Sequence, residues 1–273
     1  MGTAPSIFEG RRTVQALSIM YHDVVARGEF DSSGFAGGGA DIYKLEREEF
    51  AGHLEAIRGA LGGKTVVLAE ERWDTGRPLF LTFDDGGAGA HMHAAPLLEE
   101  RGWRGHFFIT TDRIGTPGFL SAEQIRDLDR RGHAIGSHSC SHPARIASCP
   151  WDELLREWTG SARRLADLLG KPVTLASVPG GYYTRRVGDA AAAAGLRTLF
   201  TSEPTVRVGA RGECRILGRY AIWRGMPAAR SGDLAAGRLA TRWKQAAWWE
   251  IKRGAKRVLG ERYEKARGAW MGQ

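Results

Sequence analysis

Two adjacent carboxylates, Asp84 and Asp85, follow the apolar segment 79–83 and precede Gly86. Side chains along a strand alternate between its two faces, so both carboxylates can serve one site only if the strand ends just before them. A carboxylate pair at the carboxyl end of a buried strand is typical of catalytic sites in α/β barrels. The same residues are also typical of an ordinary turn, and this segment alone does not decide between the two interpretations.

A second group able to do chemistry is the histidine pair His138 and His142, which follows the apolar residues Ala134 and Ile135. Neutral imidazole is a common ligand of zinc-like ions, and two histidines with one carboxylate form a familiar open catalytic set. Histidines four residues apart are by themselves a weak signal. Together with a carboxylate pair at another strand end, they predict a metal-dependent catalytic site.

The two segments resemble the first two motifs of the polysaccharide deacetylases, also called the NodB-homology domain and grouped with carbohydrate esterase family 4. The motifs of this family are Thr-Phe-Asp-Asp-Gly and His-Ser/Thr-x-x-His-Pro. Both are intact here, at residues 82–86 and 138–143. The resemblance extends over about residues 14–225, which is most of the chain.

This resemblance implies a role for each of the four side chains. Asp85, His138 and His142 would hold one divalent metal ion, zinc or alternatively cobalt, nickel or iron. Asp84 would be the general base that takes a proton from the attacking water. Adjacent aspartates suit this division because a cation fixes one of them while the other stays free to accept a proton.

The third motif of the family, an arginine and a proline followed by an aromatic residue and glycine, is altered in this chain. Ser177 stands where the family has the arginine that orients the base, and Gly180 replaces the aromatic residue after Pro179. A backbone N–H does not depend on the side chain, so Gly180 is still expected to donate to the oxyanion. Tyr182 and Tyr183 are the expected substitutes for the aromatic residue that covers the substrate.

The last motif of the family, Leu-x-His, is absent, because residues 216–220 are Ile-Leu-Gly-Arg-Tyr. Exopolysaccharide N-deacetylases with a permuted motif order instead carry a Tyr-His pair on the first strand, which Tyr21 and His22 resemble. The chain is therefore most similar to this permuted type, and His22 is the expected general acid. The alternative is a strand-end histidine that is bonded within the core.

Alternating strands and helices must position these residues. The alternation predicts parallel β/α units, and the resemblance narrows the fold to a distorted seven-stranded (β/α)7 barrel of the α/β class. The segment 27–40 is too long for a plain connection and is expected to form a lid or rim. The expected strands are 16–22, 65–68, 79–83, 106–110, 133–136, 173–178, 198–201 and 215–223, and the expected helices are 44–61, 91–101, 121–131, 150–169 and 185–194.

The formal net charge of +8 is concentrated near the C-terminus, where residues 238–267 hold ten Lys and Arg against three Glu, a net charge of +7. We expect residues 1–230 to form the catalytic barrel and residues 231–273 to form a basic, tryptophan-rich tail with an amphipathic helix. Such a helix favours peripheral contact with an anionic membrane through residues 234–270. The alternative is a helix that packs on the barrel with an ordinary charged outer face. A nucleic-acid partner is not expected, because no aromatic platform or known binding fold accompanies the charge.

Other features of the sequence concern the cellular compartment of the protein. No run of eighteen apolar residues is present, and residues 1–12 do not have the pattern of a secretory signal. The three cysteines, Cys140, Cys149 and Cys214, cannot all pair and do not have the spacing of a zinc ribbon. These features predict a cytoplasmic protein, with the inner face of the membrane as a site of peripheral contact.

The combined interpretation is a metal-dependent hydrolase that removes acetyl groups from N-acetylated, or with less support O-acetylated, sugars of a glycan or its precursor. Water would attack the acetyl carbonyl with Asp84 as base, and His22 would protonate the leaving amine. One alternative is a hydrolase of another non-peptide carbon–nitrogen bond. The other is a non-catalytic carbohydrate-binding or scaffold barrel, which the altered third motif and the missing C-terminal histidine favour.

Overall fold

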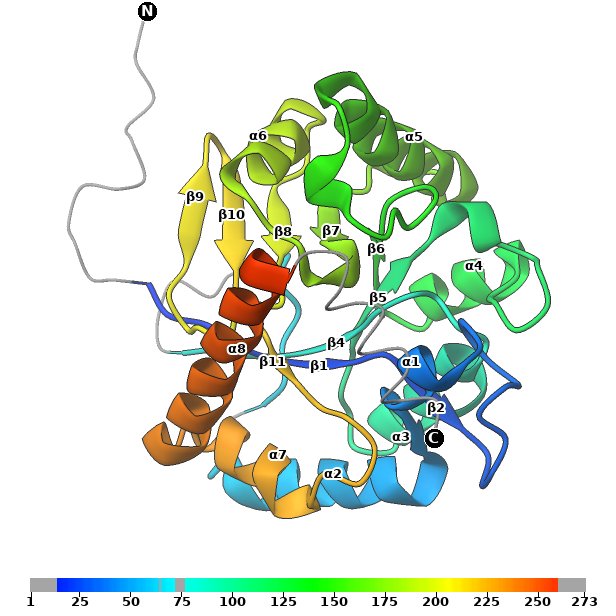
Figure 1. Ribbon diagram of the computed structural model, residues 1–273. Coiled ribbons are helices and arrows are strands. Elements are labelled where there is room, and N and C mark those ends of the chain that lie inside the picture. Colours follow the sequence, from blue (N-terminus) through cyan, green and yellow to red (C-terminus); the bar gives the residue numbers. More distant parts are fainter. Residues whose placement is uncertain (1–13, 64, 72–76, 260–273) are drawn as a thin grey trace, which may run out of the picture.

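The computed structural model describes residues 14–63, 65–71 and 77–259 (Figure 1). Its centre is a curled sheet in which, among the described residues, the strand order is β11-β1-β4-β5-β6-β7-β8-β10-β9. Neighbouring strands are parallel, and only β9 runs antiparallel, to β10. The strands are β1 (Leu17–Tyr21), β4 (Leu79–Phe83), β5 (His106–Ile109), β6 (Ala134–Ser137), β7 (Leu175–Ser177), β8 (Thr198–Phe200), β9 (Gly209–Arg211), β10 (Cys214–Leu217) and β11 (Tyr220–Ala221).

The segment that contains β10 and β11 joins the two ends of the parallel sheet. β10 pairs with β8, and β11 pairs with β1, so one interrupted strand contacts both ends. The interruption occurs at Gly218, where a Cβ would lie 2.3 Å from the carbonyl oxygen of Glu203. The predicted continuous strand 215–223 is therefore wrong in detail. With β10 and β11 taken as one strand, the parallel strands number seven, and the predicted distorted (β/α)7 fold class is confirmed.

Helices cover the outer face of the curled sheet (Figure 1). Their lengths follow the apolar spacing of the sequence, and α4 begins with the capping box expected from Ser121 and Gln124, each accepting a hydrogen bond from the backbone N–H of the other. The helices are α1 (Gly38–Asp41), α2 (Arg47–Ala60), α3 (Ala95–Glu99), α4 (Ala122–Arg130), α5 (Trp151–Leu169), α6 (Arg185–Ala193), α7 (Ala228–Ala235) and α8 (Leu239–Leu259). No helix among the described residues is long and apolar enough to cross a membrane.

The C-terminal helices continue directly from the sheet. α7 packs against α2, and the predicted division between residues 230 and 231 falls inside α7. The helix expected in the tail is present as α8, while residues 260–273 of the predicted tail lie outside the described residues.

Three expected elements differ from the structure. Lys44–Glu46, expected to begin a helix, instead forms β3, which pairs with β2 (Asp23–Val25) in a separate small sheet. The expected strand 65–68 is reduced to one bridge between Val66 and Leu79. The expected helix 91–101 is a π-helical turn over Ala90–Ala94 followed by α3, because Pro96 has no N–H to continue the hydrogen-bonding pattern.

The two faces of the sheet have different cores. On the outer face, Leu81 and Phe83 of β4 pack in one cluster with helix residues such as Phe50 and Leu97. On the inner face, Phe80, Phe108 and Phe200 form a smaller cluster. The residues of β4 thus alternate between the two cores, and all five of them are buried up to the carboxyl end of the strand.

The loop that follows Asp85 lies directly on Asp23, at the start of β2. A Cβ on Gly87 would be 2.0 Å from an Asp23 carboxylate oxygen, so this position requires glycine. The neighbouring Gly89 N–H donates to Ser33 Oγ at 2.7 Å. Asp23 is only 3% exposed, and its burial raises the pKa of the carboxyl group to about 7.

This raised pKa predicts a pH dependence of stability. The folded state binds the Asp23 proton more tightly than the unfolded state, so wild-type stability should fall as pH rises from about 4 through about 7. Asn at this position cannot titrate, so Asp23→Asn should gain stability relative to wild type over that window, by roughly 1–4 kcal/mol. Urea unfolding of the metal-free protein at pH 4.5 and pH 8 measures the difference, with the exposed Asp152→Asn as control. A difference that does not change with pH would contradict the assignment.

Candidate active site

Backbone conformation brings the two adjacent aspartates to the same pocket. β4 ends at Phe83, and Asp85 has a φ of 75°, in the left-handed region that is uncommon for residues with a side chain. Gly86 follows with a φ of 82°. This reversal of the chain allows Asp84 and Asp85 to line one pocket although they are neighbours in sequence.

Asp85, His138 and His142 converge on one point. One ligand atom from each of them lies within 4.8 Å of the other two. Asp85 Oδ1 is 3.3 Å from His138 Nε2 and 3.5 Å from His142 Nε2. His142, with a φ of 58°, shares the left-handed conformation of Asp85, and such backbone conformations are concentrated at functional sites. Two imidazoles and one carboxylate at this spacing fit a zinc-like divalent ion with an open coordination position.

The hydrogen bonds of His138 fix the tautomer that a metal ligand needs. His138 Nδ1 lies 3.1 Å from the carbonyl oxygen of Ser177 and 2.6 Å from its Oγ. A carbonyl oxygen can only accept, so the proton is on Nδ1 and the Nε2 lone pair is left for the site. The Ser177 hydroxyl in turn donates to Asp84 Oδ1 at 3.0 Å. Ser177 therefore connects a predicted metal ligand to the predicted base.

The two other predicted ligands are also in the forms that bind metal. Burial, together with the nearby His138, lowers the pKa of His142 to about 4, so its ring is neutral at pH 7. Burial alone would raise the pKa of Asp85, but the histidines around it, His138 first, outweigh burial and lower the pKa. Deprotonated ligands are the forms that hold a divalent ion.

Asp84 forms a buried, two-pronged ion pair with Arg219. The guanidinium donates to Oδ1 at 2.7 Å and to Oδ2 at 2.8 Å, and the Arg219 side chain is completely buried. Burial by itself would raise the pKa of Asp84, but the charge and the hydrogen bonds of Arg219 outweigh burial and lower it. Asp84 is therefore a carboxylate at neutral pH, held in one orientation.

The surroundings of Arg219 hold the guanidinium in place. Its central carbon lies 5.8 Å from the ring centre of Phe108 and 6.0 Å from that of Phe200. Its Nε donates to the carbonyl oxygen of Thr201 at 3.0 Å. Arg219 follows Gly218, so the break between β10 and β11 is the point from which this side chain reaches Asp84.

This arginine was not expected from the sequence motifs. There, the replacement of the third-motif arginine by Ser177 indicated the loss of the group that orients the base. In the structure, Arg219 of another strand carries the cation and Ser177 adds a further hydrogen bond. One signal was available: an arginine within an otherwise apolar strand is costly unless it is paired.

His22 lines the same pocket and is partly buried. Its ring stacks on Tyr43, with ring centres 4.5 Å apart, and its Nδ1 has no hydrogen-bond partner among the described residues. Burial lowers the pKa of His22 against the opposing charges of Asp85 and Asp84. The ring is therefore mainly neutral near pH 7, and its role as acid stays a prediction.

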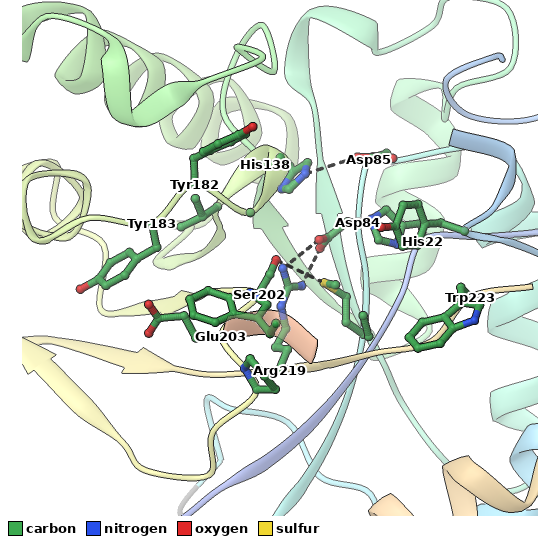
Figure 2. A pocket seen from close by; sticks show the side chains of 18 of the residues that line it. His22, Asp84, Asp85, His138, Tyr182, Tyr183, Ser202, Glu203, Arg219 and Trp223 are labelled. Atoms are coloured by element: carbon green, nitrogen blue, oxygen red, sulfur yellow. Dashed lines mark hydrogen bonds and ion pairs between the residues drawn. The ribbon is translucent and has the colours of Figure 1, made fainter. Parts of the chain in front are cut away.

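The remaining predicted site residues form one wall of the pocket (Figure 2). Gly180 has a φ of 65° and lies in a short turn with Pro179 and Gly181. Tyr182 and Tyr183 follow this turn and also line the pocket. The structure thus brings all eight predicted site residues to one pocket of about 660 Å³: His22, Asp84, Asp85, His138, His142, Gly180, Tyr182 and Tyr183.

Further aromatic side chains, which the sequence analysis did not assign to the site, complete the walls. The long segment 27–40 lines the pocket through Phe35, whose ring centre is 4.9 Å from that of His142, so the expected rim is confirmed. Trp223 lies beyond β11, and α8 contributes Trp248 and Trp249. These tryptophans come from a part of the chain that sequence motifs did not connect with the site.

Three of the histidines without an assigned role have structural partners. His53 bonds to Ser231 and to the carbonyl oxygen of Met226. His106 bonds to the backbone of Leu81 and Ala69. The ring of His133 lies 2.7 Å from Glu99, outside the pocket.

Comparisons with known proteins identify relatives of the chain. Residues 72–199 match the family described as polysaccharide deacetylase. A Bacillus subtilis (strain 168) protein, YxkH, provisionally named a polysaccharide deacetylase, is 25% identical over 192 residues, which are 68% of this chain and 64% of that protein. The match thus spans just under two thirds of the length of this relative.

Solved structures share the fold. The deacetylase PplD of Streptococcus pyogenes, in complex with acetate, superposes with a TM-score of 0.66 and 18% identity over 79% of this chain and 96% of that one. IcaB from Ammonifex degensii gives a TM-score of 0.65 and 20% identity over 81% of this chain and 97% of that one. The family match supports the predicted resemblance to the polysaccharide deacetylases, and the solved structures share the fold, while the permuted subtype stays a prediction.

The convergence of three donors predicts metal binding. Purified protein should contain about one divalent ion per chain, and His138→Ala or Asp85→Ala should lose it, because an open site with three protein ligands cannot spare one. Elemental analysis measures the content. The control is His91→Ala, which removes a histidine paired with Asp127 at 2.9 Å and outside the pocket. Equal metal content in wild type and all three variants would refute the site.

Proposed function

We propose that this chain, a relative of the polysaccharide deacetylases, is a metal-dependent hydrolase that removes acetyl groups from N-acetylated sugars of a glycan or glycan precursor. The proposal is carried by one observation. A charged carboxylate, Asp84, is held in a single orientation by Arg219 beside three convergent metal donors. This is the arrangement that activation of water next to a polarised carbonyl requires.

Asp85, His138 and His142 would hold the cation. When bound, a divalent ion supplies Lewis-acid chemistry: it polarises the acetyl carbonyl and makes water easier to deprotonate. Asp84 would accept the water proton, since its low pKa keeps it ionised and its two bonds to Arg219 keep it oriented. Water oxygen then forms the new bond to the acetyl carbon, and the bond to the sugar nitrogen breaks.

The departing amine needs a proton, and we assign its delivery to His22. The His22 ring is neutral, so it must first gain a proton. Asp84 can supply one after it has taken the proton of the water, because a carboxyl group with a lowered pKa gives up its proton readily. The proton taken from water would thus pass to His22 and then to the amine, so that protons balance over one turnover. The Gly180 N–H would donate to the oxyanion, as the resemblance to the family implies.

The pocket walls support a sugar as substrate. A volume of about 660 Å³ falls within the usual range for small-molecule sites, roughly 300–1,000 Å³. Aromatic side chains present a large apolar face with a polar edge, which suits the mixed surface of a sugar ring. The aromatic residues that line the pocket are Phe35, Tyr43, Tyr182, Tyr183, Trp223, Trp248 and Trp249.

The alternatives have less support than they had from sequence alone. The non-catalytic interpretation depended on a base without its arginine and on the missing C-terminal histidine; Arg219 removes the first of these grounds by supplying the cation. Hydrolysis of another carbon–nitrogen bond uses the same base and metal donors. A panel of N-acetylated and O-acetylated sugars and a cyclic imide, assayed with and without added zinc, separates these functions by the products that are released.

The assigned proton carriers predict a difference between substrates. Asp84→Asn should keep its metal but lose about 100-fold or more on both an N-acetyl sugar and an activated acetate ester, since both need deprotonated water. His22→Ala should lose a similar factor only on the N-acetyl substrate, because the activated ester has a leaving group that departs without a proton. Steady-state rates on the two substrates measure this. Equal losses in His22→Ala would remove His22 as the acid.

The buried ion pair predicts a shift in the pH profile. Arg219→Gln removes the cation that favours the charged form of Asp84, so the pKa of Asp84 should rise and the acid limb of kcat/KM should move to higher pH, by about 1–2 units. Arg219→Lys keeps the charge but not the two-pronged geometry, so its limb should stay near wild type while kcat falls. Unfolding and metal content serve as folding controls. A purely structural role would lower the yield of folded protein and leave the limb unchanged.

A further inference from the structure

Helix α8 packs on the barrel through polar side chains. Arg242 Nε donates to the Tyr220 hydroxyl at 3.1 Å, and Gln245 Nε2 donates to the Ala221 carbonyl oxygen at 2.6 Å. Thr241 is 8% exposed and donates to Asp233 at 3.1 Å. Figure 1 shows α8 beside β10 and β11, above α7. These hydrogen bonds of α8 to β11 and α7 therefore come from hydrophilic groups, while Trp248 and Trp249 line the pocket.

The outward side of the same helix is apolar. Leu239, Trp243, Ala247 and Ile251 recur every four residues and so form one ridge along the helix surface, which we call the α8 ridge. The side chains of Leu239, Trp243 and Ile251 are 64%, 72% and 63% exposed. Of the two arrangements considered from the sequence, packing on the barrel is found, but the outer face of the helix carries an apolar ridge and not only charged residues.

This arrangement costs free energy unless another apolar phase covers the ridge. Large apolar side chains exposed in a continuous row mark an interaction surface, whereas single exposed ones are ordinary. The described structure offers no cover for the three large side chains of the ridge, which remain more than half exposed.

The charge of the C-terminal sequence indicates what covers the ridge. In the sequence, residues 238–267 include ten Lys and Arg against three Glu, and Lys244 is exposed next to Trp243. A second copy of the chain would bring two strongly positive segments together, which is unfavourable at physiological ionic strength. An anionic surface is attracted instead, and tryptophan with flanking basic residues is typical of helices that lie at the membrane interface.

We propose that the α8 ridge docks on an anionic phospholipid bilayer. Trp243 and Ile251 enter the boundary between headgroups and acyl chains, and Lys244 and neighbouring basic residues contact the lipid phosphates. Trp248 is 51% exposed and also lines the pocket, so the pocket opens next to the docked helix. This binding does not depend on the proposed hydrolytic activity.

The experiment is sedimentation of the full chain with phospholipid vesicles. Wild type should bind vesicles of phosphatidylcholine and phosphatidylglycerol (3:1), bind pure phosphatidylcholine far less, and lose binding as salt is raised. The double variant Trp243→Ala/Ile251→Ala should bind at least about 10-fold more weakly, because most of the inserting apolar area is removed. The matched control is Trp151→Ala, which removes a tryptophan that is 40% exposed at the start of α5.

Several outcomes would overturn the proposal. One is wild-type protein that does not sediment with anionic vesicles, and another is a double variant that binds as well as wild type and Trp151→Ala. A third is a lipid-free dimer in equilibrium sedimentation that the double variant abolishes, since the ridge would then be an interface between two copies. A fourth is binding that occurs only after deletion of residues 260–273, which would make that segment the cover. Hydrolysis of a soluble substrate, unchanged in the double variant, separates this test from that of the proposed function.

Discussion

The ion pair between Asp84 and Arg219 is the interaction on which the rest of the site depends. A carboxylate with almost no exposure can stay charged only if a cation and hydrogen bonds replace the lost water. Arg219 supplies the cation and Ser177 a further bond. Removing one partner of such a pair leaves an uncompensated buried charge, which typically costs about 3–5 kcal/mol. The break between β10 and β11 places Arg219 where it reaches this carboxylate.

The ion pair is also connected to the metal donors. The Ser177 hydroxyl donates to Asp84 and accepts from His138 Nδ1, so its single proton is directed by both neighbours. The same contact sets the tautomer of His138, which leaves Nε2 available to a metal. A serine at this position can therefore accept the hydrogen bond of His138, whereas an arginine could not, because a guanidinium cannot accept a hydrogen bond. The altered motif is a rearrangement of the site in which two residues share the task of one.

What could be predicted from the sequence was local. The ends of β4 and β6 follow from short apolar segments, and the capping box of α4 lies within four residues, so these features and the four motif side chains were found. Arg219 contacts a residue 135 positions away, and no local pattern reports such a contact. The strand at 65–68 was wrong because its composition suits a strand but only one residue finds a partner. The orientation of α8 could not be predicted from the sequence either, since periodicity identifies an apolar face but not the direction in which that face points.

The interrupted strand has a consequence for the order in which the site is assembled. The predicted metal donors and the base are all present once the chain reaches residue 142, on strands that pair with their neighbours in sequence. The cation that orients the base arrives only at residue 219, on the segment that also joins β8 to β1. The segment that closes the sheet is thus also the segment that carries Arg219 to Asp84, so the predicted base meets its cation only where the two ends of the sheet are joined.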